Sequence, residues 1–324
     1  MSSLVTRNAW TMGLAAFLGL LLIATKFIQP EFGISGLDSL SRAALPFALA
    51  TLGMAIVIIS GGIDLSVASI MAVASVTAAV LMQGASDALS GLVVALVLLI
   101  GLLIGATNGA LIVLTRVPDI VVTLATLFVW EGAAILILES PGGGAAPWLR
   151  ELIVGGVTVP GVPDGLTAWI PKSLVFLLVC LALIWVPIRR SRLGLMFYAI
   201  GSDQLAAFRS GVPVRRTRII AYAFSGLFAA LGGLVVTMST GIGEPIPGPY
   251  LLASVAATVL GGVSLTGGKG GLLGPIVAVF ILRLVRLDLT LLSVDPNVTT
   301  IVEGTIMVIV VMLGGLLAMK GRRS

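Results

Sequence analysis

The sequence contains no histidine and only one cysteine, Cys180. The lack of histidine excludes imidazole acid–base catalysis and histidine-ligated metal sites. One cysteine cannot form a disulfide within the chain or a CxxC site, and its apolar surroundings, LLVCLALIW, are typical of an inert thiol that faces protein or lipid. We therefore expect neither a catalytic residue nor a metal site in this chain.

Charged residues are also scarce. They make up 10% of the 324 residues, whereas an ordinary soluble protein has about 25%. Hydrophobic residues make up 58%, and the mean hydropathy is +1.17. So few charges cannot cover the surface of a soluble protein of this length, and most of the chain must therefore face lipid.

The basic residues form no recognisable nucleotide or nucleic-acid site. The net charge is +5, but Lys and Arg cluster in short segments between apolar runs, which is typical of membrane orientation and not of nucleic-acid binding. A phosphate-binding loop GxxxxGK[ST] ending at Lys269 would need glycine at Val263 and Ser or Thr at Gly270. We expect this chain to bind neither ATP nor another cofactor.

Long apolar segments dominate the sequence, and a transmembrane helix needs about 20 mostly apolar residues. The first segment is longer than the core of a usual signal peptide and no A-x-A cleavage site follows, so we interpret it as a retained span. We predict one all-α polytopic membrane domain over residues 1–324, with about ten transmembrane helices in the segments 8–25, 43–63, 65–86, 88–115, 120–138, 173–188, 219–243, 245–268, 270–292 and 298–319.

The distribution of basic residues predicts the orientation of these spans. If the N-terminus is cytoplasmic and the spans alternate, most of the 19 Lys and Arg residues lie in cytoplasmic segments and most acidic residues lie outside. The reversed topology violates the positive-inside rule. We therefore expect a multi-pass inner-membrane protein with both termini in the cytoplasm.

Two loops are large enough to carry function. The loop 140–171 is rich in Gly and Pro, includes Trp148 and Trp169, and is external in the predicted topology. It is either a connector with interfacial aromatic residues or part of a docking surface.

The second loop, 189–218, is the most polar part of the chain and is cytoplasmic in the predicted topology. Within it, residues 202–209 are typical of a short helix that Ser202 or Asp203 caps and that Gly211 and Pro213 end. Arg clusters flank this helix, so it is either an anchor to lipid headgroups or a handle for a soluble partner.

Glycine-rich segments interrupt two of the apolar runs. The helix breaks are expected at Gly61, Gly62, Gly261, Gly262, Gly267 and Gly268, where the freed backbone groups need water or protein partners. After the first break, Asp64 can accept N–H bonds at the start of the next helix. Asp64 and Ser66 then belong either to a tight cap and turn or to the transport pathway and its gate.

Some predicted spans contain charged residues, namely Glu131, Arg283, Arg286, Asp288 and Glu303, and Asn108 is a polar residue inside another span. An unpaired charge in hydrocarbon costs about 2.5 kcal/mol or more, so both glutamates should face protein or water. Pairing with arginine, protonation and proton coupling are all compatible with this constraint. Asn108 lies between small residues, which indicates close helix packing with an interhelical hydrogen bond or, alternatively, a place along the pathway.

Taken together, these segments resemble a known family, the membrane permease subunits of bacterial ABC importers of the ribose/xylose/galactose type. The resemblance runs from about residue 45 to 315, and branched-chain amino-acid permeases are related. It rests on GGIDLSVAS at 61–69, GATNGALI at 105–112, VPDIVVTLATL at 117–127, YAIGSDQLAAFRSGV at 198–212, SGLFAALGGLV at 225–235 and SVAATVLGGVSLTGGKGGLLGPIVAVFIL at 254–282.

The resemblance implies a type II-like permease fold with short or broken helices and a cytoplasmic coupling helix. It implies two permease subunits, a cytoplasmic ATPase that holds ATP and Mg²⁺, and a periplasmic substrate-binding protein. It also implies that the loop 189–218 transmits ATPase movements, through Gly201, Ser202, Asp203, Gln204, Ala206, Ala207, Arg209, Ser210 and Gly211.

The implied function is ATP-driven import of a monosaccharide, a pentose or a hexose. The alternatives are the same machine for a polyol, a nucleoside or an autoinducer-like sugar derivative, an ion-coupled secondary transporter that uses Glu131 or Glu303, and a passive channel. Candidates for the pathway or its gates are Asp64, Ser66, Asn108 and Glu131.

The sequence departs from the family pattern at four positions. Asp203 stands where many relatives have Asn, Glu131 precedes Gly132 where Arg is expected, and Ala68 and Ala278 replace glycines. The charge reversal at Glu131 indicates either an unusual substrate or a second, non-identical permease with the complementary charge. The sequence leaves homodimer and heterodimer open.

Overall fold

The computed structural model of the chain describes residues 2–158, 161, 167–246 and 248–320, and this part is helical, with only isolated β-bridges outside the helices. The all-α prediction is thereby confirmed. The helices are α1 (Ser2–Ile28), α2 (Ile34–Ile59), α3 (Val67–Met82), α4 (Asp87–Thr115), α5 (Asp119–Ile137), α6 (Pro147–Glu151), α8 (Lys172–Cys180), the π-helical turn η1 (Leu181–Trp185), α9 (Val186–Arg190), α10 (Arg192–Ser202), α11 (Gln204–Arg209), α12 (Val214–Thr240), α13 (Tyr250–Leu260), α14 (Leu273–Leu291) and α15 (Pro296–Lys320).

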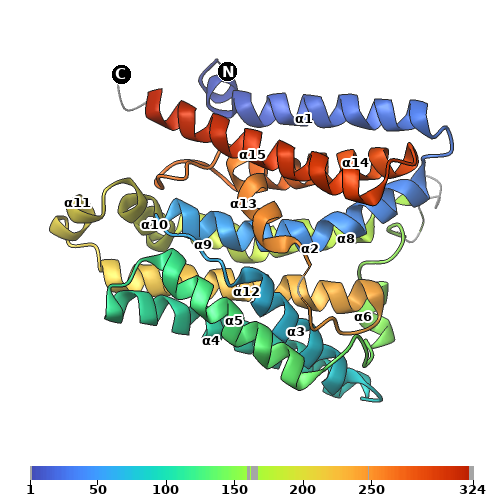
Figure 1. Cartoon of the computed structure of the whole chain (residues 1–324), viewed down its shortest axis with the longest axis horizontal. Helices are drawn as coiled ribbons and strands as arrows, with labels where there is room; N and C mark the ends of the chain where they lie inside the picture. Colours follow the sequence, from blue (N-terminus) through green and yellow to red (C-terminus); the bar gives the residue numbers. More distant parts are fainter. Residues whose placement is uncertain (1, 159–160, 162–166, 247, 321–324) are drawn as a thin grey trace.

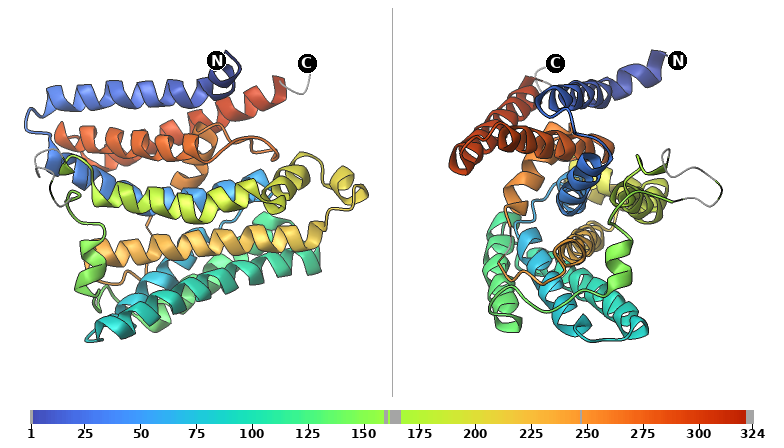
Figure 2. Two further views of the ribbon diagram at one scale, coloured as in Figure 1. Left: turned by 180° about the vertical axis from the view of Figure 1, so that it is seen from behind. Right: turned by 90° about the vertical axis from the view of Figure 1, so that its right-hand side faces the viewer.

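The long helices run side by side in stacked layers (Figure 1). Helices α1, α14 and α15 form one outer layer, α2 and α8 lie in the middle, and α3, α4 and α5 form the opposite layer, with α12 between it and α2. The beginning of α1 and the end of α15 lie toward the same end of the bundle as α11, which projects beyond the long helices (Figures 1 and 2).

Within the described residues, six helical segments are long and apolar enough to cross a membrane, namely Ala9–Ile28, Ile34–Ile59, Asp87–Thr115, Asp119–Ile137, Lys172–Arg190 and Val214–Thr240. The shorter α3 and α13 are also apolar. Helix α14 carries Arg283, Arg286 and Asp288, and α15 carries Glu303. A multi-pass membrane protein is therefore supported, and the count of about ten spans stays a prediction.

The span boundaries differ from the predicted ones where the helices end or begin with polar residues. Helix α2 begins at Ile34 and not near Ala43, because Asp38 and Arg42 form an ion pair of 2.9 Å one helical turn apart. Asp38 also accepts a hydrogen bond from the backbone N–H of Gly155. Helix α13 ends at Leu260, well before the predicted end of its span at residue 268, because the glycine-rich break begins at Gly261.

Small residues let α4 and α12 approach closely. A Cβ atom at Gly105 would overlap the carbonyl oxygen of Tyr222, and one at Gly101 would lie 2.5 Å from the carbonyl oxygen of Gly226. A Cβ at Gly109 would lie 2.8 Å from Cα of Ile219. The three α4 glycines are spaced by four residues and share one helix face, which is the small-xxx-small pattern of membrane helix pairs.

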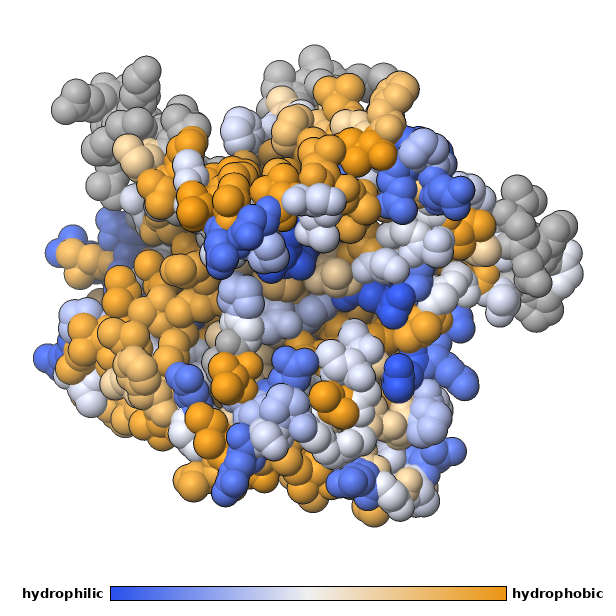
Figure 3. Space-filling model, turned by 45° about the vertical axis from the view of Figure 1, so that its right-hand side comes forward, coloured by the Kyte–Doolittle hydropathy of each residue, from blue (hydrophilic) through white to orange (hydrophobic). Residues whose placement is uncertain are grey.

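The outer surface of the bundle is broadly apolar, as Figure 3 shows for one face. Leu92, Phe128 and Leu136 are among the exposed large hydrophobic residues, with exposed fractions of 69%, 65% and 88%. Such a surface is stable only in contact with lipid or another protein. By contrast, α2 is buried along most of its length and forms the centre of the core with α12 and α3.

The predicted external loop 140–171 packs against the ends of α3 and α12. Gly144 donates its N–H to the carbonyl of Ala79 at 3.0 Å, and Ala145 donates to that of Gly241 at 3.2 Å. Helix α6 then places Leu149 in the core, whereas Trp169 is 52% exposed. Residues 159–160 and 162–166 of this loop lie outside the described part, and its docking role stays a prediction.

Candidate functional site

Both predicted helix breaks are present, and both helices end in the same way. Gly61 and Gly262 have φ of 85° and 87°. At the end of α2, Gly61 donates to the carbonyl of Ile58 and Gly62 to that of Val57, and at the end of α13 Gly262 and Val263 repeat this pattern. These are Schellman closures, in which a glycine in the left-handed conformation satisfies the last carbonyls of a helix.

The other glycines of the breaks serve two different needs. Gly267 and Gly268 have φ of 82° and 70°, so they too occupy the left-handed region. Gly62 and Gly261 do not, and close approach explains them instead. A Cβ at Gly62 would lie 2.5 Å from Oδ2 of Asp119 and one at Gly261 would overlap the backbone of Pro275.

Three of the four predicted pathway residues form one buried cluster behind the first break. The Ser66 side chain donates to Oδ1 of Asp64 at 2.5 Å, and the Ser66 N–H donates to the same oxygen at 3.0 Å. Asn108 of α4 donates through Nδ2 to the Ser66 hydroxyl at 2.7 Å. All three residues are fully buried. The cluster thus ties the start of α3 to α4, and Ser66, not Asp64, is the N-cap residue of α3.

Two polar atoms of this cluster lack partners among the described residues. No hydrogen bond reaches Oδ2 of Asp64 or Oδ1 of Asn108, although both atoms are buried. Leaving such atoms unpaired costs free energy, so the cluster as it stands is not fully satisfied by the described contacts.

A second polar cluster beside the first break joins α5 to α12. Arg218 donates through Nη2 to both carboxylate oxygens of Asp119, at 2.5 and 2.6 Å, and the Tyr222 hydroxyl donates to Oδ2 at 2.7 Å. Tyr222 and Thr123 also lie within hydrogen-bond distance of the carbonyl oxygen of Ile63, at 3.3 and 3.4 Å. The break is therefore held from both α5 and α12.

Sequence reasoning missed this second cluster. Asp119 lies in the motif at 117–127 and Arg218 ends the polar loop 189–218, so 99 positions separate the two residues. The only signal in the sequence is that each of them directly precedes a predicted span.

Glu131 lies apart from both clusters. It is half-buried on α5, a helix that otherwise exposes large apolar residues such as Leu124 and Phe128. No ion pair to Glu131 is present within the described part of the chain. Glu303, in contrast, accepts a hydrogen bond from Arg286 of α14 at 2.9 Å and is therefore a paired carboxylate.

The predicted short helix in the cytoplasmic loop is present as α11. Asp203 is its N-cap residue and accepts hydrogen bonds from the N–H groups of Leu205 and Ala206, both at 2.9 Å. Ser202 does not cap it, because its hydroxyl donates to the carbonyl of Tyr198. At the other end, Gly211 has a φ of 83° and completes a Schellman closure.

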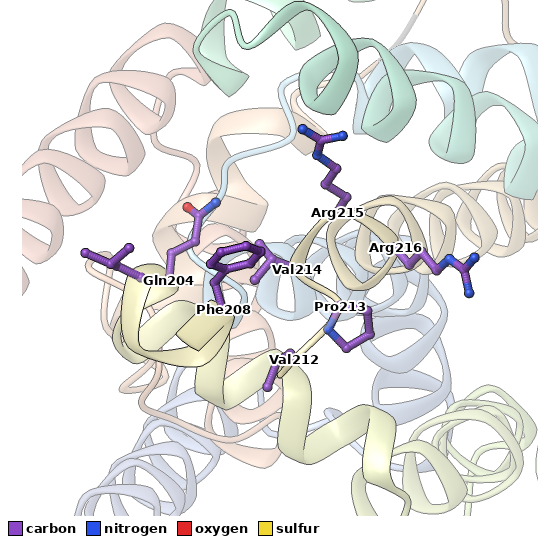
Figure 4. Close-up of a pocket in the computed structure, with 8 residues that line it drawn as sticks. Gln204, Phe208, Val212, Pro213, Val214, Arg215 and Arg216 are labelled. Carbon is purple, nitrogen blue, oxygen red and sulfur yellow. The ribbon is translucent and has the colours of Figure 1, made fainter. Parts of the chain in front are cut away.

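Helix α11 exposes its large apolar side chains. Leu205 is 58% and Phe208 is 67% exposed, whereas Ala207 is buried and packs with Ile200 and Val214. A cavity of about 650 Å³ separates α11 from the start of α12. Figure 4 shows Gln204, Phe208 and Val214 around this space, with Arg215 and Arg216 pointing in different directions.

A second cavity of about 360 Å³ adjoins the first. It lies between the turn that joins α4 to α5 and the start of α12, and Gln204, Val214 and Arg215 line both cavities. Arg116, Asp119 and Arg218 complete its polar lining. The surface around α11 is therefore concave and apolar, with arginine side chains at its edge.

Comparison with known proteins agrees with this architecture. Residues 36–311 match the family model described as "Branched-chain amino acid transport system / permease component". Autoinducer 2 import system permease protein LsrD of Escherichia coli (strain K12) and of Shigella flexneri are each 29% identical to the chain over 321 residues, covering 94% of this chain and 92% of the relative. The protein of the same name from Escherichia coli O157:H7 is 28% identical.

No solved structure matches the chain. The family match covers most of the sequence, including both helix breaks, both polar clusters and α11. The chain therefore belongs to the family of branched-chain amino acid transport system permease components, and it is a membrane permease subunit of an ABC importer.

Proposed function

We propose that the chain forms the translocation path of an ATP-driven importer and that α11 is the element that a cytoplasmic ATPase grips. The observation that carries this proposal is the exposure of Leu205 and Phe208 on a capped helix that projects beyond the bundle (Figure 1). ATP and Mg²⁺ belong to the ATPase, and a periplasmic binding protein delivers the cargo from the opposite side.

The local structure favours a protein partner for α11. An isolated helix of six residues is unstable in water, so its shape depends on the Asp203 cap and on the packing of Ala207. Two large apolar side chains on such a rigid support are typical anchors that fill a pocket in a partner. The concave, apolar space beside Phe208 offers the partner a complementary place to insert a side chain of its own.

The cytoplasmic side is then the end of the bundle that carries α11. The first turns of α5 and α12 lie at this end, together with the start of α1 and the end of α15 (Figures 1 and 2). Both termini are cytoplasmic in this orientation, as the basic residues of the sequence predict. The loop 140–171 then faces the periplasmic binding protein.

The two helix breaks provide the hinges for alternating access. Asp64, Ser66 and Asn108 form the gate of the path, since this buried cluster holds the first break closed against α4. Glu131 faces a second permease subunit, because a carboxylate on the membrane face of α5 requires a cationic or polar partner. Subunits with a cation at the facing position fit best, so we favour a heterodimer.

The cargo that we propose is a monosaccharide or a small sugar derivative. The motif at 61–69 supports the sugar branch of the family, and relatives at 28–29% identity are named for import of autoinducer 2, which supports a sugar derivative as the alternative. An ion-coupled transporter that uses Glu131 or Glu303 is less favoured, because Glu303 pairs with Arg286. Of these two carboxylates, Glu131 alone is then a candidate for ion coupling.

Replacement of both Leu205 and Phe208 by Glu should abolish docking of the ATPase. The tagged chain would be purified from its native membrane in mild detergent, and the co-purifying proteins identified. The unaltered chain should bring an ATPase and a second permease with it. The double variant should keep the second permease and bind the ATPase about 1,000-fold more weakly, as expected when two interface anchors of about 2 kcal/mol each are lost.

The matched control is Phe208→Leu, which keeps an apolar side chain on α11 and should retain the ATPase. Recovery of the ATPase at the original level with the Leu205→Glu/Phe208→Glu variant would contradict the docking role of α11. Recovery of the unaltered chain without any ATPase, in several mild detergents, would favour the secondary transporter.

A further inference from the structure

The last turn of α10 touches both helix breaks, and Gly201 does so through backbone atoms alone. A Cβ atom at Gly201 would overlap the carbonyl oxygen of Ile59 and would lie 2.6 Å from the backbone nitrogen of Gly268. Gly201 is helical and its φ is outside the left-handed region. Glycine is disfavoured relative to alanine within a helix. Close approach, and not an unusual backbone conformation, therefore explains glycine at this position.

The two breaks also meet each other at this point. Gly268 donates its N–H to the carbonyl of Ile59, the last residue of α2, at 2.9 Å. A Cβ at Gly267 would lie 2.7 Å from the carbonyl oxygen of Gly201 and 3.0 Å from Cα of Gly61. We call Gly61, Gly201, Gly267 and Gly268 the glycine junction.

Helix α11 is attached to the glycine junction by a very short connection. Only Ser202 and the cap residue Asp203 separate Gly201 from the first residue of α11. Ser202 itself packs closely against Gly268, since a Cβ atom at Gly268 would overlap the Ser202 hydroxyl. A displacement of α11 cannot be absorbed by a flexible linker here.

Tyr198 adds a second attachment one helical turn earlier. Its hydroxyl donates to the carbonyl oxygen of Gly270 in the second break at 2.8 Å. Burial raises the pKa of this hydroxyl, and the nearby Arg189 opposes the shift, so Tyr198 stays protonated and able to donate. Helix α10 is thus fixed to the second break by one side chain and by backbone contact.

From the junction, contacts continue to the rest of the bundle. Gly62 packs against Asp119 and Tyr222, and Asp64 joins Asn108 through Ser66. When one segment is displaced, backbone contacts of this kind cannot adapt by a change of side-chain rotamer. Close-packed protein interiors therefore transmit strain. Coupling between distant sites needs such a contiguous element together with two states that each site favours differently.

We propose that Gly201 is the positioning residue through which movement of α11 reaches both helix breaks at once, with Tyr198 as the second attachment. This inference rests on the proposed docking of the ATPase on α11. Neither residue touches the cargo. They act by holding the two breaks to one rigid segment, so that closure of the ATPase moves both hinges together.

Hydrogen exchange on the purified complex with its co-purifying ATPase tests this proposal. Exchange would be compared without nucleotide and with ATP plus vanadate, in peptides that cover 59–66, 202–211 and 261–271. In the unaltered complex, nucleotide should change exchange in all three segments. In Gly201→Ala the change in 202–211 should persist, whereas the nucleotide-dependent change in the two breaks should fall by about 5- to 150-fold, the usual range of coupling between sites.

Tyr198→Phe provides the second variant, because it removes one hydroxyl and leaves the backbone packing intact. It should weaken the response of 261–271 more than that of 59–66, and it decides the outcome if Gly201→Ala does not assemble. The matched control is Gly271→Ala, since a Cβ at Gly271 meets nothing within 4 Å and this glycine does not have positive φ. The control should respond as the unaltered complex does.

The results separate this proposal from the function on which it rests. If both breaks respond to nucleotide in Gly201→Ala as they do in the unaltered complex, the role of the junction is overturned and the docking of α11 stays in place. If Gly201→Ala does not assemble, an unaltered response of 261–271 in Tyr198→Phe has the same meaning. A complex in which nucleotide leaves 202–211 unchanged would overturn the docking role itself, and this inference with it.

Discussion

At the residue scale, the glycines of the first helix break meet two different structural needs. Gly61 and Gly62 are adjacent, yet one adopts the left-handed conformation and the other makes room for Asp119. Both the left-handed conformation and the close approach require a residue without a Cβ atom. Glycine in the sequence therefore does not reveal which of the two requirements applies. Asp64 and Ser66 could be named together from the sequence because they share one motif, whereas the contact of Asn108 with Ser66 is visible only in the structure.

Asp119 and Arg218 illustrate the opposite case, because only the fold brings them together. Their side chains are 15% and 18% exposed and form a bidentate pair beside the first break. Asp119→Asn leaves Arg218 without its anionic partner and should destabilise the protein by about 3 kcal/mol. The thermal unfolding midpoint of the purified protein should fall accordingly.

Two further variants show whether the loss of stability comes from the ion pair between Asp119 and Arg218. The double variant Asp119→Asn/Arg218→Gln should lose less unfolding free energy than the two single variants lose together, because neither group is then left as an unpaired charge. Arg216→Gln, on the exposed side of the same helix, should stay within about 0.5 kcal/mol of the original. Additive losses in the double variant would show that the two residues act independently.

At the element scale, helix existence was predictable and helix ends were less so. The apolar length of each run predicts a helix, and the Asp203 cap with Gly211 predicts α11. The early start of α2 was not predictable, because the ion pair of Asp38 and Arg42 and the bond to Gly155 make charged residues acceptable in its first turns. Pairing of helices depends on which small residues face each other.

The contact between α4 and α12 gives the sharpest test of an element pair. Gly105→Ala places a methyl group against the carbonyl oxygen of Tyr222 and should destabilise the protein by about 1–3 kcal/mol, the usual cost of overpacking. Gly91→Ala lies in the same helix, where a Cβ meets nothing within 4 Å, and should be neutral or stabilising by up to about 1 kcal/mol.

The measurement is the thermal unfolding midpoint of both variants in one detergent, with assembly checked by size-exclusion chromatography. If Gly105→Ala is as stable as Gly91→Ala, then α4 and α12 can move apart without a loss of stability. Close packing of this helix pair would then not hold the bundle together.

At the scale of the whole molecule, the arrangement of the helix ends is compatible with the orientation that the basic residues predict. The basic residues predict cytoplasmic termini, and the structure places the beginning of α1, the end of α15 and the projecting α11 toward the same end of the bundle (Figure 1). The packing of the long helices into layers could not be read from the sequence, because the candidate spans have similar mean hydropathies of 1.9 to 2.8 and small residues, which direct packing, are frequent in the chain.

The single cysteine of the chain makes this orientation directly measurable. Cys180 is buried among apolar side chains, so Cys180→Ala, which adds no polar group there, gives a background without thiols. On this background Trp169→Cys and Leu205→Cys place one thiol at each end of the bundle, at positions that are 52% and 58% exposed. A membrane-impermeant maleimide should label only Trp169→Cys in right-side-out vesicles and only Leu205→Cys in inverted vesicles. The reverse pattern would place α11 outside, where no ATPase can reach it, and would contradict both the topology and the coupling that depends on it.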